Sequence, residues 1–303
     1  MHSRVSLVSM AALVLTALAM SFCSHAFSAG PVVEISQDDW VAAKKEATLP
    51  TGVTLKYVEM GQPGGQPLVL IHGMTDNSRS WSLIAPFLAS SHRLIIPDLR
   101  GHGGSGKPDT RMYTVSLHAD DIAALMDALN IGKAHVLGHS LGSMVAQALA
   151  INYPEKVNKV VLESSALVTF ESLGKGIYEA AVGFGENPPD DAFMAEWYSN
   201  PNPVDQDFLK REMAESQAIP PSAWKAIAKG SSASDLSNFM DELKAPVLVL
   251  WGSADGFFGA EAQKALKEAI PQAESVDYDN IGHNIQWEIP ERMAKDVLGF
   301  LAK

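Results

Sequence analysis

The sequence predicts an α/β protein built on a mostly parallel sheet with helices on both faces. Short apolar runs, typical of buried strands, alternate along the chain with longer segments whose apolar residues recur at helical spacing. Parallel strands read as continuous apolar runs because helical connections cover both faces of their sheet. The alternation stops between residues 166 and 243, which predicts a helical cap inserted between two strands.

Composition limits the partners of this chain. Its 303 residues are 47% hydrophobic, enough for a substantial core, and its formal net charge is −12. Phosphate binding needs a basic face, so we expect no nucleic-acid partner. Nothing in the composition indicates an oligomeric state.

The first 26 residues have the pattern of a secretory signal peptide. Arg4 gives a positive start, the stretch Val5–Phe22 is apolar, and Ser24-His25-Ala26 fits a cleavage site. We expect cleavage of residues 1–26, a periplasmic or secreted mature protein, and no stable membrane insertion. The alternative is an uncleaved anchor, because the apolar run approaches the length of a membrane span. Cleavage would also remove Cys23, the only cysteine, and exclude disulfides.

The expected elements follow from these patterns. We expect strands over residues 53–60, 68–71, 94–96, 134–137, 159–162, 247–251 and 275–278. We expect helices over residues 80–88, 117–129, 141–151, 261–269 and 291–301, and a short helix around Trp40. The glycine-rich residues 61–67 indicate a turn or hairpin loop.

The segment Gly138-His139-Ser140-Leu141-Gly142 stands between an expected strand and an expected helix, with no loop separating them. The chain must turn within two or three residues, which forces strained dihedrals on the central residue. Glycines on either side leave room for so sharp a turn. This is the pattern of a nucleophile elbow, in which Ser140 stands at the tip. The alternative is a glycine-flanked serine that caps the helix.

Chemically useful side chains also follow other expected strands. Asp255 and His283 come after the strands at 247–251 and 275–278. In such sheets, ligands bind beyond the carboxyl ends of the strands, so we expect both side chains to approach Ser140 there. Glu163 also follows a strand and is the second candidate for the acid.

These segments together resemble the α/β-hydrolase superfamily over residues 50–303. The matching stretches are LVLIHGM, PDLRGHGGSGKP, VLGHSLGSMVA, PVLVLWGSADGFF and NIGHNIQWEIPE. The resemblance implies an α/β core formed by residues 27–165 and 244–303, with residues 166–243 as a cap over the site.

The chemistry of this constellation gives each residue a role. Ser140 would attack a carbonyl carbon, His283 would take the serine proton, and Asp255 would orient and stabilise the imidazolium. Backbone N–H groups of Met74 and Leu141 would hold the oxyanion.

A serine at the elbow narrows the reaction class. Haloalkane dehalogenases and epoxide hydrolases are similar in architecture but carry aspartate there, so Ser140 argues against both. We expect a serine hydrolase that cleaves a carboxylic ester or lactone through an acyl-enzyme. Carbon–carbon bond hydrolases and cofactor-free haloperoxidases that act as perhydrolases remain alternatives, as does a catalytically silent binding protein on the same fold.

Aromatic residues in the expected cap and near strand ends favour a small apolar ester or lactone as the substrate. Trp81, Trp197 and Phe257 are the candidates for contacting it. No cluster of His, Asp and Glu has the spacing of a metal site, and "GHGGSG" lacks the Lys-Ser/Thr of a phosphate-binding loop, so we expect no metal and no cofactor.

Three further histidines have no role in this scheme. We expect His102, His118 and His139 to be solvated or structural.

Overall fold

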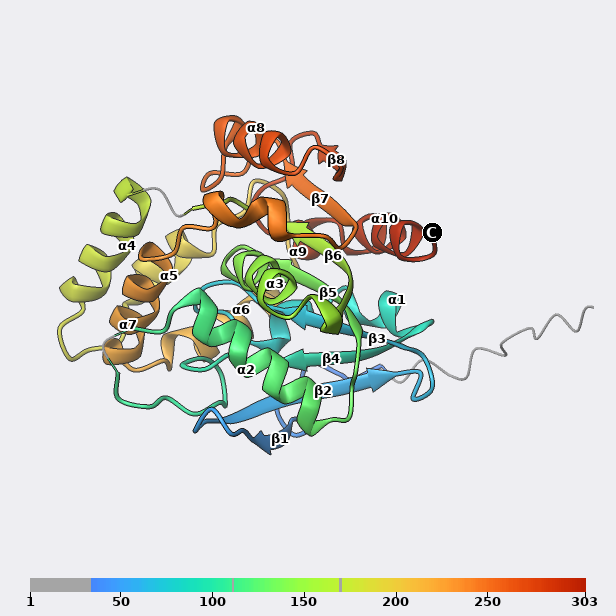
Figure 1. Cartoon of the computed structure of the whole chain (residues 1–303). Helices are drawn as coiled ribbons and strands as arrows, with labels where there is room; N and C mark the ends of the chain where they lie inside the picture. The colour runs from blue at the N-terminus through green and yellow to red at the C-terminus, as the bar shows by residue number, and fades with distance from the viewer. Residues whose placement is uncertain (1–33, 111, 169–170) are drawn as a thin grey trace, which may run out of the picture.

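The computed structural model describes residues 34–110, 112–168 and 171–303. The expected signal peptide, residues 1–26, lies outside the described residues. The strands form one eight-stranded sheet in the order β1-β2-β4-β3-β5-β6-β7-β8 (Figure 1). The pairs from β4–β3 to β7–β8 are parallel, whereas β1–β2 and β2–β4 are antiparallel. The predicted fold class, a mostly parallel α/β sheet, is therefore confirmed.

All seven expected strands are present, and one strand was not expected. The bounds are β1 (Lys45–Thr48), β2 (Thr54–Gly61), β3 (Gln66–Ile71), β4 (His92–Pro97), β5 (Ala134–His139), β6 (Val157–Glu163), β7 (Val247–Gly252) and β8 (Glu274–Tyr278). The loop at residues 61–67 is not a hairpin, because β4 pairs between β2 and β3. Every residue of β5 is buried, as expected for a central strand covered on both faces.

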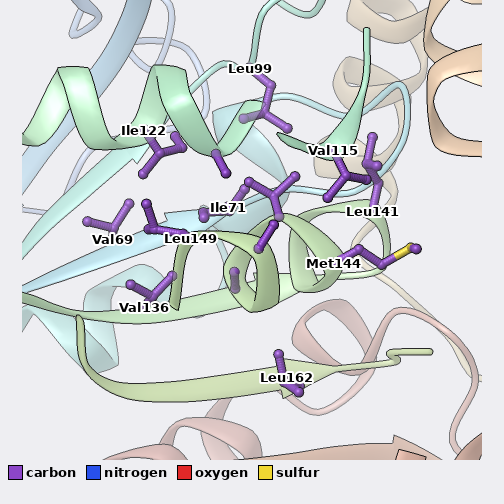
Figure 2. Close-up of a cluster of buried hydrophobic side chains, with 14 of the residues drawn as sticks. Val69, Ile71, Leu99, Val115, Ile122, Val136, Leu141, Met144, Leu149 and Leu162 are labelled. Atoms are coloured by element: carbon purple, nitrogen blue, oxygen red, sulfur yellow. The ribbon is translucent and has the colours of Figure 1, made fainter. Parts of the chain in front are cut away.

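Helices cover both faces of the sheet. On one face lie α2 (Val115–Ala128), α3 (Leu141–Asn152) and α8 (Ala260–Ala269), whose apolar side chains form one core cluster with the sheet. Figure 2 shows part of this cluster, including Val69, Val136 and Leu149. A second cluster packs the opposite face against α1 (Ala85–Ala89), α9 (Ile285–Glu288) and α10 (Pro290–Leu301).

The chain between β6 and β7 is helical, as expected of an insert. It contains α4 (Glu171–Gly183), α5 (Asp191–Trp197), α6 (Gln206–Gln217), α7 (Pro221–Ser232) and the 3₁₀ helix η3 (Ser237–Glu242). Helices α4, α5 and α7 gather beyond the carboxyl ends of the parallel strands (Figure 1, left). These are the ends where ligands bind in such sheets.

Carboxylate side chains of α6 attach this insert to the core. The carboxylate of Glu212 accepts hydrogen bonds from the backbone N–H and the side-chain amide of Asn77, at 3.1 and 3.2 Å. Arg79 donates to Glu215 at 2.9 Å through its Nε. Burial raises the pKa of Glu212 well above its usual range, and the nearby carboxylates of Asp76 and Glu215 raise it further. Packing against the core therefore favours the neutral form of Glu212.

Two local expectations differ from the structure. Trp40 is buried, but its segment forms turns that lead into the edge strand β1 rather than a helix. The expected helix at 80–88 is divided into the 3₁₀ helix η1 (Ser78–Trp81) and α1. Within the described part of the chain, no helix combines the length and apolarity needed to cross a bilayer.

A layer of buried histidines supports the loop after β3. The rings of His72 and His102 lie 5.0 Å apart, and those of His102 and His118 lie 5.9 Å apart. The backbone N–H of Leu99 donates to Nε2 of His72 at 2.9 Å, which fixes the ring beside the start of the loop. All three histidines are fully buried, so His102 and His118 are structural and not solvated.

This histidine layer predicts acid lability. Burial lowers the pKa of His118 to about 3, and burial also lowers the pKa of His102 well below its ordinary value. Below about pH 6.5 the unfolded chain binds protons that the folded chain excludes, so the free energy of unfolding falls as pH falls. Neither ring nitrogen of His118 has a hydrogen-bond partner among the described residues, so His118→Leu should be tolerated.

We predict that His118→Leu lowers this acid sensitivity. Between pH 7.5 and pH 5, its free energy of unfolding should fall by about 2 kcal/mol less than that of the parent. Urea unfolding at both pH values measures the difference. Equal losses in the two proteins would contradict the assignment of His118 as a buried neutral group.

Candidate active site

The turn from β5 into α3 places Ser140 at its tip. Ser140 has φ 53° and ψ −119°, a backbone conformation that side-chain-bearing residues rarely adopt. The neighbouring backbones are so close that only glycine fits on either side. A Cβ on Gly138 would lie 2.1 Å from the carbonyl oxygen of Gly142, and a Cβ on Gly142 would lie 2.1 Å from that of Ile71. The glycine pattern in the sequence thus has a steric cause.

Asp255 and His283 meet at the same edge of the sheet. Nδ1 of His283 lies 2.9 Å from each carboxylate oxygen of Asp255. Backbone N–H groups of Phe257 and Phe258 donate to Oδ1 of Asp255 at 2.8 and 3.0 Å. Burial alone would raise the pKa of Asp255, but His283 and these hydrogen bonds outweigh it and lower the pKa below its ordinary value. Asp255 is therefore held as a carboxylate beside the imidazole.

The backbone of His283 is held from two neighbouring strands. Its carbonyl oxygen accepts a hydrogen bond from Oγ of Ser164 at 2.7 Å, just beyond β6. It also accepts one from Nε2 of His139 at 3.1 Å, at the end of β5. The rings of His139 and His283 lie 4.9 Å apart. Two parts of the sheet edge thus fix the position of the histidine loop.

Glu163, the second candidate for the acid, supports the main chain instead. Its Oε1 accepts a hydrogen bond from the backbone N–H of Gln286 at 2.9 Å, near the start of α9. Its backbone carbonyl accepts the N–H of Ser140 at 3.0 Å. Burial raises the pKa of the Glu163 carboxyl to about 7, although His139 and the Gln286 N–H lower it in part. The structure thus places Asp255, rather than Glu163, at Nδ1 of His283.

An inner cavity of about 50 Å³ lies above these residues. Its volume corresponds to roughly four water molecules. Apolar and polar groups share its wall. The lining residues are Met74, Asp76, His139, Ser140, Leu141, Met144, Ile177, Trp197, Tyr198, Ser231, Phe257, Phe258, His283 and Asn284.

A larger outer cavity of about 580 Å³ adjoins the inner one. Trp197, Phe257 and His283 line both cavities. The rings of Trp197 and Phe257 lie 5.6 Å apart, and Nε1 of Trp197 donates to Oγ1 of Thr75 at 3.1 Å. The tryptophan of α5 is thereby fixed to the loop after β3, between the two cavities.

The structure brings together most of the residues singled out in the sequence. Ser140 and His283 line the inner cavity, as do Met74 and Leu141, and Asp255 lies directly behind His283. Trp197 and Phe257 line it as well.

The prediction that Trp81 contacts the substrate is wrong. It is fully buried in the core cluster on the opposite face of the sheet and does not line the cavity. It follows β3 in the sequence, but it ends the 3₁₀ helix η1 and its side chain packs within the second core cluster.

Sequence reasoning missed the polar side of the inner cavity. Asp76 and His139 lie there, and Tyr198 donates its hydroxyl proton to Oδ1 of Asp76 at 3.0 Å. His139 was expected to be solvated or structural; it is buried and holds the carbonyl of His283, so it is structural, and it also lines the cavity. Its position just before Ser140 was the one available signal. Among the described residues, no group of three or more His, Cys, Asp or Glu side chains is placed to hold a metal ion.

Known proteins share this architecture. A relative from Pseudomonas putida, the dihydrolipoyllysine-residue acetyltransferase component of an acetoin cleaving system, is 33% identical over 83% of this chain and 68% of its own length. A 2-hydroxy-6-oxononadienedioate/2-hydroxy-6-oxononatrienedioate hydrolase from Burkholderia vietnamiensis is 28% identical over 84% of this chain and 92% of its own. The solved structure of a thermophilic esterase from Thermogutta terrifontis superimposes with a TM-score of 0.74 at 26% identity, covering 86% of this chain and 98% of the esterase.

The family model of the alpha/beta hydrolase fold matches residues 66–290, which include the elbow and the loops that carry Asp255 and His283. The chain therefore belongs to the α/β-hydrolase fold family.

Proposed function

We propose that this protein is a serine hydrolase that cleaves carboxylic esters or lactones through an acyl-enzyme. The observation that carries the proposal is the contact of His283 with the Asp255 carboxylate beside a cavity that also contains Ser140. An acid, a histidine and a serine at a strained turn form the constellation that activates a hydroxyl group for acyl transfer.

In the proposed mechanism, Oγ of Ser140 attacks the carbonyl carbon as Nε2 of His283 takes the serine proton. Backbone N–H groups of Met74 and Leu141 hold the negative charge that develops on the carbonyl oxygen. His283 then gives its proton to the leaving alkoxide, and an acyl-enzyme remains on Ser140. A water molecule, activated by the same imidazole, releases the acid and restores the hydroxyl. Asp255 stabilises the imidazolium throughout.

The charge of the inner cavity favours an ester or lactone over a dicarboxylate substrate. The Burkholderia relative is named for a dioate, which carries two carboxylates. No lysine or arginine is among the described residues that line the inner cavity, and Asp76 contributes a carboxylate to it. A second buried anion would lose its hydration without gaining a cationic partner. Carbon–carbon bond cleavage of such acids is therefore the less favoured reaction for this site.

We predict that Ser140→Ala abolishes ester hydrolysis and leaves the fold intact. The substitution removes the attacking oxygen, and alanine meets the same backbone restriction at φ 53° as serine does. Turnover of p-nitrophenyl acetate and butanoate, with circular dichroism as the control for folding, measures both effects. Activity within tenfold of the parent would show that another group performs the chemistry, and a silent binding protein would show no turnover in either form.

The same assay should distinguish between the two candidates for the acid that orients His283. Asp255→Asn removes the charge that orients and stabilises His283, and we expect a loss of at least about a hundredfold in kcat. Glu163→Gln keeps a hydrogen-bond acceptor for the N–H of Gln286, so kcat should fall by less than about tenfold. A larger loss in Glu163→Gln than in Asp255→Asn would overturn the assignment of the acid.

We also propose that the protein is exported and begins at Phe27 after cleavage. The support is the Arg4-led apolar run that ends in Ser24-His25-Ala26. N-terminal sequencing of the protein from its native cell, together with fractionation, tests this. An intact Met1 in the membrane fraction would favour an uncleaved anchor.

A further inference from the structure

On the polar side of the inner cavity, a carboxylate and an imidazole nitrogen face each other without a hydrogen bond between them. Oδ2 of Asp76 and Nδ1 of His139 lie 3.7 Å apart. Both side chains are at least 95% buried, and both residues line the cavity. Nδ1 of His139 has no hydrogen-bond partner among the described residues. A buried polar atom of this kind is costly unless something pairs with it.

The hydrogen bonds around the pair determine what each atom can accept when His139 is neutral. Nε2 of His139 faces the carbonyl oxygen of His283 at 3.1 Å and must donate its proton there, because a carbonyl cannot donate. In the neutral imidazole, Nδ1 is then the acceptor. Oδ1 of Asp76 accepts the hydroxyl of Tyr198 at 3.0 Å, and Oδ2 accepts that of Ser80 at 3.3 Å. A carboxylate has about four acceptor positions, so some remain open.

Gly73 packs closely beside both groups. A Cβ on Gly73 would lie 2.8 Å from Nδ1 of His139 and 2.9 Å from Oδ2 of Asp76. Any larger residue at position 73 would therefore clash with both groups. Two further carboxyl groups, those of Glu212 and Glu163, interact electrostatically with Asp76. Burial raises the pKa of Glu212 and Glu163, and the charge of Asp76 adds to both shifts.

We propose that Asp76 and His139 form a subsite for a hydrogen-bond-donating group of the substrate, an ammonium or a hydroxyl close to the scissile ester. An ammonium has protons for both acceptors, and a hydroxyl has one for the carboxylate. The subsite adjoins the reacting atoms because His139 directly precedes Ser140 and its ring lies 4.9 Å from that of His283. This inference rests on the proposed ester hydrolysis and narrows the substrate class to esters of small hydroxy acids, amino acids or diols.

Matched esters and one variant test the subsite. Phenyl esters of propanoic acid, hydroxyacetic acid and glycine have acyl groups of nearly equal size, and they suit the small inner cavity. Propyl acetate and 2-hydroxyethyl acetate differ by a hydroxyl group in the alcohol part of the ester. Asp76→Asn keeps an oxygen for the hydroxyl of Tyr198 but loses the charge. The control variant is Glu196→Gln, which removes a carboxylate from the outer cavity only.

The measured quantity is the kcat/KM ratio of each donor-bearing ester to its apolar partner, compared between parent and variant. Differences in intrinsic reactivity between esters cancel in this comparison. In at least one of the two ester series, which vary the acyl part or the alcohol part, Asp76→Asn should lower the ratio by about tenfold or more. A loss of this size is expected when a hydrogen bond to a charged group is removed. Glu196→Gln should leave the ratio unchanged.

Three outcomes are decisive. Ratios unchanged by Asp76→Asn in both series, with the apolar esters still hydrolysed, would overturn the subsite while ester hydrolysis stands. An equal fall of the ratio in Glu196→Gln would also overturn it, because the negative charge of the site as a whole would then explain the preference. If no ester is hydrolysed, the proposed function fails, and calorimetric titration of 2-aminoethanol and 1-propanol decides the subsite. The subsite is supported if the parent binds 2-aminoethanol but not 1-propanol and Asp76→Asn loses this binding. It is overturned if the parent does not bind 2-aminoethanol.

Discussion

The turn between β5 and α3 holds Ser140 in a backbone conformation that costs about 1–3 kcal/mol, and the packing around it supplies that energy. Gly138 and Gly142 approach neighbouring backbone so closely that a methyl group on either would lie 2.1 Å from a carbonyl oxygen. The strand is buried on both faces and the helix packs on the sheet, so neither can shift to relax the turn. The position of every group around Ser140 is set relative to this turn.

Strain of this kind recurs around the cavity. Thr75, Ser164 and Asn280 also have positive φ values without being glycine. Each lies shortly after a strand, at the carboxyl edge of the sheet. Thr75 accepts the indole N–H of Trp197, and Ser164 donates to the carbonyl of His283, so two of these strained residues fix the cap and the histidine loop. The core stabilises a set of unfavourable conformations that together shape the site.

Much of this arrangement could be predicted from the sequence, because it depends on local patterns. Continuous apolar runs located seven strands, and the order of serine, acid and histidine at strand ends located Ser140, Asp255 and His283. Pairings between distant segments could not be predicted. No local signal in the sequence indicates that β4 lies between β2 and β3. None indicates that Trp81 packs in the second core cluster instead of the cavity. The approach of Asp76 to His139 likewise depends on two loops that meet only in the folded sheet.

The central claim is that Ser140 is the activated nucleophile of this cavity. The most direct measurement is mass spectrometry of the folded protein after treatment with a fluorophosphonate, which modifies activated serine hydroxyls covalently. The account predicts a single adduct per chain, located on the peptide that contains Ser140. A folded protein that stays unmodified, or an adduct on another residue with Ser140 intact, would contradict it.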